Sequence, residues 1–386
     1  MVSKKNENFF KKLWLQKMIK LSDKNIIVHD FCGHPFTYEL AQKFYTENFN
    51  VNYLFTSDDK GPKAEFSQTK CPFSDLSINL SIPKRNPLKR LFWEINYAFK
   101  LRSKLHTLNT DVLICANTPV IVLFIILFNK KFDFVWWVQD IFSEAANKLK
   151  ILPAVFRGVI SKFFLYIEYF ISSKASKIIL ISNDFLEFFN KKFHNKICAI
   201  ENWPCASKLN FNKLKNNSII YAGTVGFKHG VNDIIDTIKK VNNHGYNFIF
   251  VSEGINADII SNRFKNNKRF IKYNFLDYDT LLKLIASSKG ALFVLDDSAS
   301  KVSIPSKVYT YLMCKTPVLG LCSQQHHLAR LVNNHSIGII NDVEKFMDIL
   351  KSDSKYKVYY ENVDLYSSSF KIENKFNEFL NVLKNK

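Results

Sequence analysis

Two lysines in the second half of the chain occur where a phosphate group could bind. Lys228 lies in residues 223–230 (GTVGFKHG), which follow a predicted strand and precede a predicted helix. Glycines let the backbone approach a ligand closely, and the free N–H groups at the start of a helix attract anions. The pattern favours diphosphate binding by this glycine-containing loop, together with Lys228. The alternative is an ordinary turn that carries a solvated lysine.

The second lysine, Lys307, lies in residues 303–309 (SIPSKVY), at the predicted start of another helix. Ser306 is expected to cap that helix. A cation in the first turn opposes the helix dipole by roughly 0.3–1 kcal/mol, so Lys307 is explained if an anion binds beside it. Lys307 therefore marks a second predicted anion site. The alternative is an exposed lysine without a function.

Carboxyl and amide groups follow a predicted strand in the first half of the chain. Gln139, Asp140 and Glu144 come after residues 134–138. At the carboxyl end of a parallel strand these groups would face a ligand, where they could orient hydroxyl groups or an attacking nucleophile. Asp140 could instead serve only as a helix cap.

Two further loops follow strands. Residues 30–35 lack the G-x-G-x-x-G pattern of nicotinamide-binding proteins. Asp30, Gly33 and His34 are predicted instead to leave room for an acceptor substrate. Glu253 and Gly254 follow a strand in the second half, in a position similar to that of a ribose-binding carboxylate.

No metal site is predicted. Asp296 and Asp297 are adjacent acids of the kind found in solvated loops, and His326-His327 has no acidic or cysteine partner at ligand spacing. The seven cysteines form no C-x-x-C pair. This usage favours reduced, packed thiols in the cytosol.

The elements that must position these residues alternate between strand and helix, and the alternation occurs twice. Such alternation predicts an α/β protein with two doubly wound parallel sheets. In the first half, strands are expected at residues 25–29, 51–56, 111–115, 134–138, 177–181 and 197–201, with helices at 36–48, 88–105, 119–128, 154–173 and 184–192. In the second half, strands are expected at 218–222, 247–252, 270–272, 290–295 and 316–321, with helices at 231–244, 280–287 and 306–314. Residues 57–83 are expected to be irregular.

A chain of 386 residues is longer than a single hydrophobic core usually accommodates, so two domains are expected. Residues 1–24 form a basic amphipathic extension and 25–204 an acceptor-side domain. Residues 205–217 are assigned as a linker because they are rich in Asn and Lys without periodic pattern. Residues 218–369 form the second domain, and the helix in 370–386 is predicted to pack back on the first.

The net charge of +20, from 54 basic and 34 acidic residues, predicts a polyanionic partner. Residues 4–24 contain seven lysines and two acids, and residues 84–104 contain seven basic residues and one acid. Apolar side chains recur at helical spacing in both segments: Phe9, Phe10, Leu13, Trp14, Met18 and Leu21, then Leu88, Leu91, Phe92, Ile95 and Phe99. Basic amphipathic helices with aromatic residues are typical of membrane surfaces. The alternative is that these apolar faces pack on the domain.

The chain is expected to be cytoplasmic and peripherally associated with the inner face of a membrane. No secretory signal is evident, because no continuous apolar core follows the basic start. The apolar run at residues 119–128 is far shorter than the ~20 residues that span a bilayer.

Six segments occur together and in order: residues 138–149 (VQDIFSEAANKL), 201–203 (ENW), 221–231 (YAGTVGFKHGV), 250–254 (FVSEG), 304–312 (IPSKVYTYL) and 316–320 (TPVLG). With them the chain resembles the two-domain retaining glycosyltransferases of family 4, in particular those that build bacterial surface polysaccharides, such as colanic-acid and aminodeoxysugar transferases. The resemblance implies a GT-B fold, in which two Rossmann-like domains face each other across a cleft.

The resemblance also implies an activity. A hexosyl or N-acetylhexosaminyl group would pass from a nucleotide-diphosphate sugar to a lipid-linked saccharide, in O-antigen or capsule biosynthesis, without a metal or other cofactor. The donor would be bound by Gly223, Thr224, Lys228, Glu253, Gly254, Ser303, Ser306 and Lys307. Gln139, Asp140 and Glu144 would lie near the transferred sugar, with Asp30, Gly33 and His34 on the acceptor side. Partners would be the nucleotide sugar, the acceptor and an anionic inner-leaflet surface, with no nucleic acid.

The sequence departs from the family pattern at several positions. Val302 and Thr310 stand where the family commonly has two glutamates, Lys315 replaces a glycine, and an arginine is missing near Thr224. Three alternatives stay open. A nucleic-acid-binding protein would explain the charge, and a sugar-nucleotide epimerase could have the same two-domain architecture. The missing glutamates suggest an inactive relative that acts as an assembly partner.

Overall fold

The structure is a computed structural model that describes residues 21–58, 71–78, 82, 86–147, 154–204, 215–225, 230–295 and 304–384. The chain divides into two compact units. Unit 1 comprises residues 1–201 with 372–386, and unit 2 comprises residues 202–371. Most of the predicted extension, residues 1–20, and most of the predicted linker, residues 205–214, lie outside the described residues.

Unit 1 is built on a seven-stranded parallel sheet with the order β3-β2-β1-β4-β5-β6-β7. The central strands are buried along their whole length, as expected for parallel strands covered on both faces. The strands are β1 (Ile26–Asp30), β2 (Val51–Phe55), β3 (Phe73–Asp75), β4 (Val112–Ala116), β5 (Asp133–Val138), β6 (Lys177–Leu180) and β7 (Ile197–Ala199).

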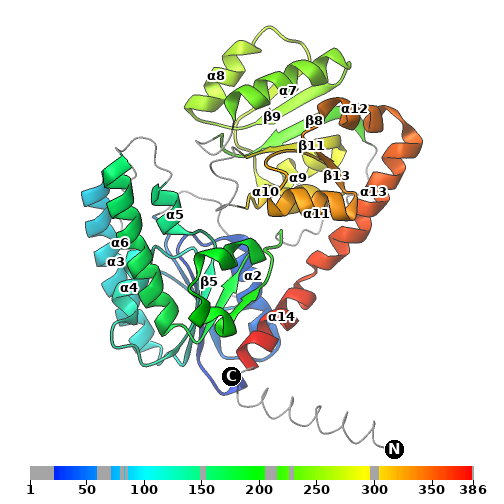
Figure 1. The fold of residues 1–386 in the computed structure, drawn as a ribbon. Helices are drawn as coiled ribbons and strands as arrows, with labels where there is room; N and C mark the ends of the chain where they lie inside the picture. The colour runs from blue at the N-terminus through cyan, green and yellow to red at the C-terminus, as the bar shows by residue number, and fades with distance from the viewer. Residues whose placement is uncertain are drawn as a thin grey trace, which may run out of the picture. The chain divides into compact units, whose positions relative to one another are not determined.

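Helices cover both faces of this sheet. Figure 1 shows α3 (Pro87–Thr107), α4 (Val120–Leu127) and α6 (Ala154–Lys174) side by side on one face, with α4 touching both of its neighbours. The other face is covered by α2 (Pro35–Thr46), against which α14 (Ile372–Lys384) packs. The short helix α5 (Phe142–Asn147) follows β5 and packs on α6.

The C-terminal helix α14 belongs to unit 1, although the residues that precede it in the chain, 202–371, form unit 2. The Phe376 ring lies 5.0 Å from the Phe44 ring between centroids, and the Phe379 ring lies 4.7 Å from that of Trp137. Both contacts are edge-on, the geometry that aromatic pairs prefer. Burial of these aromatic side chains holds the end of the chain on the first sheet.

Two expectations for unit 1 are wrong. Residues 57–83, expected to be irregular, include the edge strand β3, whose three residues are too short to show an alternating pattern. The helix expected at 184–192 is replaced by two 3-10 turns, η1 (Asn183–Phe188) and η2 (Lys191–Lys196). The backbone between them is extended at Phe189, and the side chain of Asn190 accepts a hydrogen bond from the Lys192 N–H, so a new turn begins there.

Unit 2 repeats the architecture with a six-stranded parallel sheet in the order β10-β9-β8-β11-β12-β13. Its strands are β8 (Asn216–Ala222), β9 (Asn247–Val251), β10 (Phe270–Tyr273), β11 (Ser288–Val294), β12 (Val318–Leu321) and β13 (Gly338–Ile340). Its helices are α7 (Val231–Asn243), α8 (Ile255–Arg263), α9 (Tyr278–Ser287), α10 (Lys307–Met313), α11 (His327–His335), α12 (Val343–Lys351) and α13 (Asp353–Ser367). Strand β8 begins two residues before the predicted 218, inside the segment assigned as linker.

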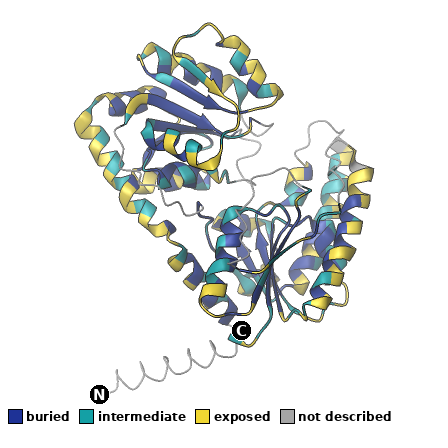
Figure 2. Ribbon diagram, turned by 180° about the vertical axis from the view of Figure 1, so that it is seen from behind, coloured by how far each residue is buried: buried dark blue, intermediate teal, exposed yellow. Residues whose placement is uncertain are grey.

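One hydrophobic cluster of unit 2 lies between the sheet and the helices on one of its faces. Buried aromatic residues from adjacent strands, including Tyr221, Phe248 and Phe250, pack with Ile234 and Phe346 of the covering helices. Figure 2 shows these strands as buried and the outward sides of the helices as exposed. The strands therefore form a rigid frame, and their carboxyl ends carry the loops described next.

Candidate functional site

Lys307 is the first residue of α10, and its ammonium group has an unusual environment. The Nζ atom has almost no accessible surface and, among the described residues, no hydrogen-bond partner. It lies 4.0 Å from the centroid of the Tyr221 ring, a cation–π contact. Burial lowers the pKa of Lys307 to about 7. A buried ammonium without a partner is costly, so this group is suited to receive an anion.

The turn that follows β8 lies against the same ammonium. Gly223 has a φ of +115°, and a Cβ built on it would lie 3.4 Å from both Cε and Nζ of Lys307. Positive φ favours glycine. The backbone of Ala222 is held by the Tyr311 hydroxyl, which accepts from its N–H at 2.9 Å and donates to its C=O at 3.2 Å. The two features predicted separately, the glycine-containing turn and Lys307, are therefore in contact.

Other predicted donor-binding residues around this turn are placed as follows. Thr224 is exposed, and its carbonyl accepts a hydrogen bond from the Tyr221 hydroxyl at 3.2 Å. Lys228 and Ser303 lie outside the described residues. The prediction that Ser306 caps the helix is wrong: its backbone is already helical, with φ −58° and ψ −23°, and its side chain makes no capping hydrogen bond. A cap needs extended backbone for its oxygen to reach the following N–H groups.

Glu253 and Gly254 follow β9, which neighbours β8 in the sheet. Gly254 has a φ of +105° and precedes α8. The Oε1 atom of Glu253 accepts a hydrogen bond from the Phe275 N–H at 2.9 Å, and the residue is exposed. One carboxylate oxygen thus ties two loops together at the carboxyl edge of the sheet.

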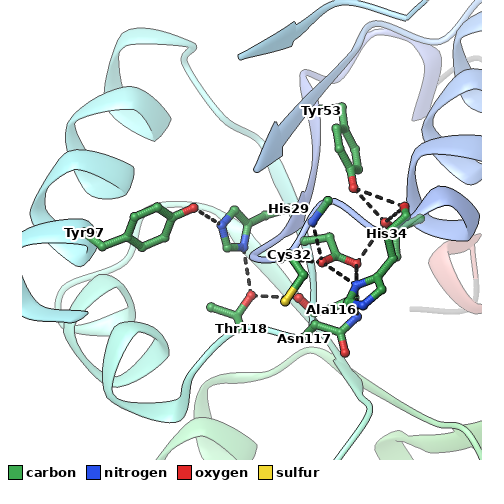
Figure 3. Close-up of polar contacts among 11 residues, drawn as sticks. His29, Cys32, His34, Tyr53, Tyr97, Ala116, Asn117 and Thr118 are labelled. Carbon is green, nitrogen blue, oxygen red and sulfur yellow. Dashed lines mark hydrogen bonds and ion pairs between the residues drawn. The ribbon is translucent and has the colours of Figure 1, made fainter. Parts of the chain in front are cut away.

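In unit 1, the loop after β1 is organised by a buried carboxylate. Asp30 accepts hydrogen bonds from five donors, at 2.9 to 3.2 Å: the N–H groups of Cys32 and Gly33, His34 Nδ1, Thr37 Oγ1 and Asn117 Nδ2. Burial opposes its ionisation, but the neighbouring His34 and the side-chain hydrogen bonds outweigh this effect and lower the pKa of Asp30. Three of the residues that donate to Asp30, namely Cys32, His34 and Asn117, are labelled in Figure 3.

The three predicted acceptor-side residues, Asp30, Gly33 and His34, are therefore together in one loop. Asp30 is fully buried and its oxygens are already engaged by the loop, whereas the His34 side chain is 24% exposed. Asp30, Cys32 and His34 also present ligand atoms within 4.8 Å of one another. A metal there would have to displace the donors that hold the carboxylate, so the chemistry of this group favours a structural role for Asp30.

His29 forms a second buried cluster beneath this loop. Its Nδ1 lies 2.8 Å from Thr118 Oγ1 and its Nε2 lies 2.9 Å from the Tyr97 hydroxyl, as Figure 3 shows. Because Thr118 donates its proton to the Ala116 carbonyl, it accepts from Nδ1–H, and Tyr97 donates to Nε2. Burial lowers the pKa of His29 to about 4, so the ring is neutral near pH 7. This cluster joins β1, α3 and the loop after β4.

A cavity of about 330 Å³ opens in unit 1 at the carboxyl ends of β1, β4 and β5. Two predicted residues, Gln139 and Asp140, line it together with Arg90 and Asn117. Its apolar walls come mainly from aromatic side chains, namely Phe31, Trp136, Trp137 and Phe142. Aromatic walls with a few polar groups are typical of small-molecule sites.

Glu144 lies on α5 and is half-buried, outside the lining of this cavity. The start of α5 is held by Glu168 of α6, which accepts from the Phe142 N–H at 2.7 Å and the Ser143 hydroxyl at 2.5 Å. Burial raises the pKa of Glu168, although these hydrogen bonds oppose the effect. The sequence analysis missed Glu168 because it is far from α5 in the chain.

The sequence analysis also missed Tyr221 and Arg90 as parts of these sites. Tyr221 lies two residues before Gly223, and its position near the end of a strand was an available signal. Arg90 was grouped only with other basic residues of a helix, because nothing local indicates which of them faces a cavity.

Comparisons with known proteins place the fold. No family model matches the chain. The chain is 22% identical over 276 residues to a probable glycosyltransferase, WbjE of Pseudomonas aeruginosa, in an alignment that covers 65% of this chain and 66% of the relative, slightly less than two thirds of its length.

Among solved structures, sucrose-phosphate synthase from Thermosynechococcus elongatus aligns with a TM-score of 0.69 and 10% identity, covering 92% of this chain and 97% of that one. WaaG, a glycosyltransferase involved in lipopolysaccharide biosynthesis, aligns with a TM-score of 0.64 and 11% identity, covering 94% and 100%. Os79 from O. sativa, solved in complex with UDP, aligns with a TM-score of 0.61 and 11% identity, covering 93% and 100%. The predicted α/β fold with two parallel sheets, of the GT-B class, is confirmed.

Proposed function

We propose that the protein is a glycosyltransferase that moves a sugar from a nucleotide-diphosphate donor to a saccharide acceptor with retention of configuration. The observation that carries this proposal is the buried, unpartnered ammonium of Lys307 against the Gly223 turn. Sequence similarity to a probable glycosyltransferase supports the same class of activity. The fold alone would not support this activity, because proteins with one fold have many different functions.

The donor would bind to unit 2. A diphosphate would supply the hydrogen-bond partner that Lys307 lacks, and Gly223 has no side chain to block its approach. Lys228, Ser303, Ser306 and the backbone at Thr224 would add contacts to the phosphates. Glu253 and Gly254, at the carboxyl end of the neighbouring strand, would line the nucleotide pocket.

The acceptor would bind to the cavity of unit 1. Its aromatic walls suit the apolar faces of a sugar ring, and Gln139 and Asp140 would orient the hydroxyl groups. Glu144, Gly33 and His34 would lie at the edge of this site. A lipid-linked saccharide of a bacterial surface polysaccharide is the acceptor class that the sequence resemblance implies.

The reaction would break the bond between the anomeric carbon and a diphosphate oxygen, and form a bond from that carbon to an acceptor hydroxyl oxygen. The hydroxyl proton would leave to a phosphate oxygen of the departing nucleoside diphosphate, so that atoms and charge balance. Negative charge grows on the leaving group, where Lys307 and Lys228 would stabilise it. The transferred group would be hexosyl or N-acetylhexosaminyl, and no step requires a metal.

Binding of nucleoside diphosphates tests this proposal directly. With UDP, GDP or ADP at 100 times its dissociation constant, we expect stabilisation of unit 2 by ~2.7 kcal/mol. For a unit of this size that corresponds to a rise in Tm of about 5–10 °C. Differential scanning calorimetry would measure it, with the matching nucleoside as control. The same shift with the nucleoside, or none with any diphosphate, would contradict the proposed donor site.

Proton uptake on binding provides a second test, because burial lowers the pKa of Lys307 to about 7. Above that pH the free protein holds a neutral amine, and a bound diphosphate would favour the ammonium. Nucleotide binding at pH 8 should therefore take up close to one proton, and affinity should fall as pH rises above 7. Calorimetric titration in buffers of different ionisation enthalpy would detect the uptake. Binding at pH 8 without proton uptake would show that the diphosphate does not contact Lys307.

A further inference from the structure

Helix α3 carries an apolar stripe that faces away from the domain. Its inward side is formed by buried residues such as Trp93, Tyr97 and Leu101. On its outer side Leu88 is 69% exposed, Phe92 70% and Phe99 58%. The stripe recurs at helical spacing, and it is part of the amphipathic pattern seen in the sequence. The alternative that this apolar face packs on the domain is wrong for these three residues.

Helix α6 carries a second stripe of the same kind. Val155 is 76% exposed, Val159 63%, Phe163 55% and Tyr166 67%, at intervals of four, four and three residues. Its buried side is formed by residues such as Ile167 and Ile171, which face the sheet. The sequence analysis did not distinguish this face, because α6 is apolar on most sides.

Helix α4 joins the two stripes into one surface. It lies between α3 and α6 and touches both. Its sequence, VIVLFIIL, contains no charged or polar side chain, and its outward residues Ile121, Phe124 and Ile125 are partly exposed. We call the exposed apolar residues of α3, α4 and α6 the three-helix face. Exposed apolar residues gathered on three neighbouring helices are typical of an interaction site.

The charge on this face has one sign. Lys89, Arg90, Lys100 and Arg102 are exposed on α3, and Lys162 and Lys174 on α6. Each of these two helices contains one acidic residue, Glu94 and Glu168, and both are buried in hydrogen bonds to other groups. The face therefore presents basic side chains around an aromatic surface and no exposed carboxylate.

We propose that the three-helix face docks on an anionic lipid bilayer. Exposed aromatic residues enter the interfacial region of a membrane, and flanking lysines and arginines attract anionic headgroups. None of the described helices is long and apolar enough to cross a bilayer. Arg90 belongs both to α3 and to the lining of the unit 1 cavity, so docking brings that cavity next to the lipid headgroups.

The binding of the full chain to vesicles tests this inference. We compare sedimentation with vesicles of phosphatidylcholine alone and with vesicles that contain a third phosphatidylglycerol. The quadruple variant L88Q/F92Q/V159Q/F163Q should lose about tenfold or more in affinity for the anionic vesicles, because four apolar groups no longer enter the interface. The matched control V358Q/L365Q changes side chains that are 54% and 76% exposed on α13 of unit 2, and it should bind like the parent.

Charge reversal separates electrostatic from apolar contributions. The variant K89E/R102E should weaken binding by about fivefold or more per residue, since each basic residue near anionic lipid contributes about 1 kcal/mol. The control K265E/K268E changes two exposed lysines of unit 2 and should have a much smaller effect. Equal binding to neutral and anionic vesicles, or equal loss in both charge variants, would overturn the inference.

The oligomeric state in solution tests the alternative that this face binds a second copy of the chain. If the three-helix face instead joins two copies of the chain, the parent would be a dimer by light scattering and the glutamine variant a monomer, and the membrane inference would fall. The inference does not rest on the proposed function. The two variants of the three-helix face lie in unit 1 and outside the proposed donor site, so nucleotide binding should be unchanged in both of them.

Discussion

Replacing Lys307 by methionine should reduce the rate of glycosyl transfer by about 100-fold, equivalent to ~3 kcal/mol, while the protein stays folded. The reason is that Lys307 has a buried ammonium without a partner beside the Gly223 turn. Without a bound anion, the buried charge destabilises the folded protein. It stabilises the transition state, because negative charge grows on the leaving diphosphate. Steady-state rates and nucleotide affinity measure the loss, and the Tm of the variant should equal or exceed that of the parent.

Lys215 offers a matched control. It is also a buried lysine of unit 2, and burial lowers its pKa to about 7 as well. Unlike Lys307 it has partners, because its Nζ donates to the Cys314 carbonyl at 3.3 Å and to Thr316 Oγ1 at 3.0 Å. Lys215→Met should therefore lower stability and leave the rate per folded molecule unchanged. If Lys307→Met turned over normally, or if both variants behaved alike, the proposed donor site would be wrong.

Replacing Asp30 by alanine should destabilise unit 1 by ~3–5 kcal/mol, because a buried charge is removed and its partners are left unsatisfied. Two backbone N–H groups and three side chains currently donate to this carboxylate. The expected fall in Tm is on the order of 10 °C. Urea unfolding followed by tryptophan fluorescence reports mainly on unit 1, because Trp93, Trp136 and Trp137 lie there and, among the described residues, Trp203 is the one tryptophan of unit 2.

The pH dependence of stability identifies the carboxylate as the cause. The pKa of Asp30 is lowered in the folded protein, so its contribution is fully present above the ordinary pKa of an aspartate and is lost as pH falls through the folded value. Asp30→Asn should remove this dependence. As a control, Asp258→Ala removes an exposed carboxylate 3.6 Å from Lys272, and it should change stability by no more than about 0.5 kcal/mol. A stable but inactive Asp30→Ala protein would show that Asp30 acts on substrate instead of holding the loop.

Much of the fold was predictable from the sequence because local patterns carry it. Short β-branched runs such as residues 26–30 and 112–116, separated by helices with periodic apolar residues, are typical of parallel strands covered on both faces. The failures came from short or irregular elements. The edge strand at residues 73–75 has no room for a pattern, and Asn190 interrupts an otherwise helical segment through a side-chain hydrogen bond.

The candidate site was predictable only in part. The rule that ligands bind at the carboxyl ends of parallel strands selected Gly223, Glu253 and Gln139, and the structure places these residues in the loops that follow β8, β9 and β5. It could not state that the Lys307 ammonium would be buried on the Tyr221 ring, since the two residues are far apart in the chain. Nor could it show that Asp30, predicted on the acceptor side, accepts hydrogen bonds from N–H groups of its own loop.

By itself the sequence determined the order of strands and helices, the basic charge and the lysines near strand ends, because these depend on composition and on spacing along the chain. Only the tertiary structure decided which polar atoms are satisfied and which apolar faces stay exposed. Helix α3 carries apolar residues on its inward side and on its outward side. Packing against the rest of unit 1 covers the inward side and leaves the outward side exposed. Burial depends on neighbours brought together by folding, and those neighbours are distant in sequence.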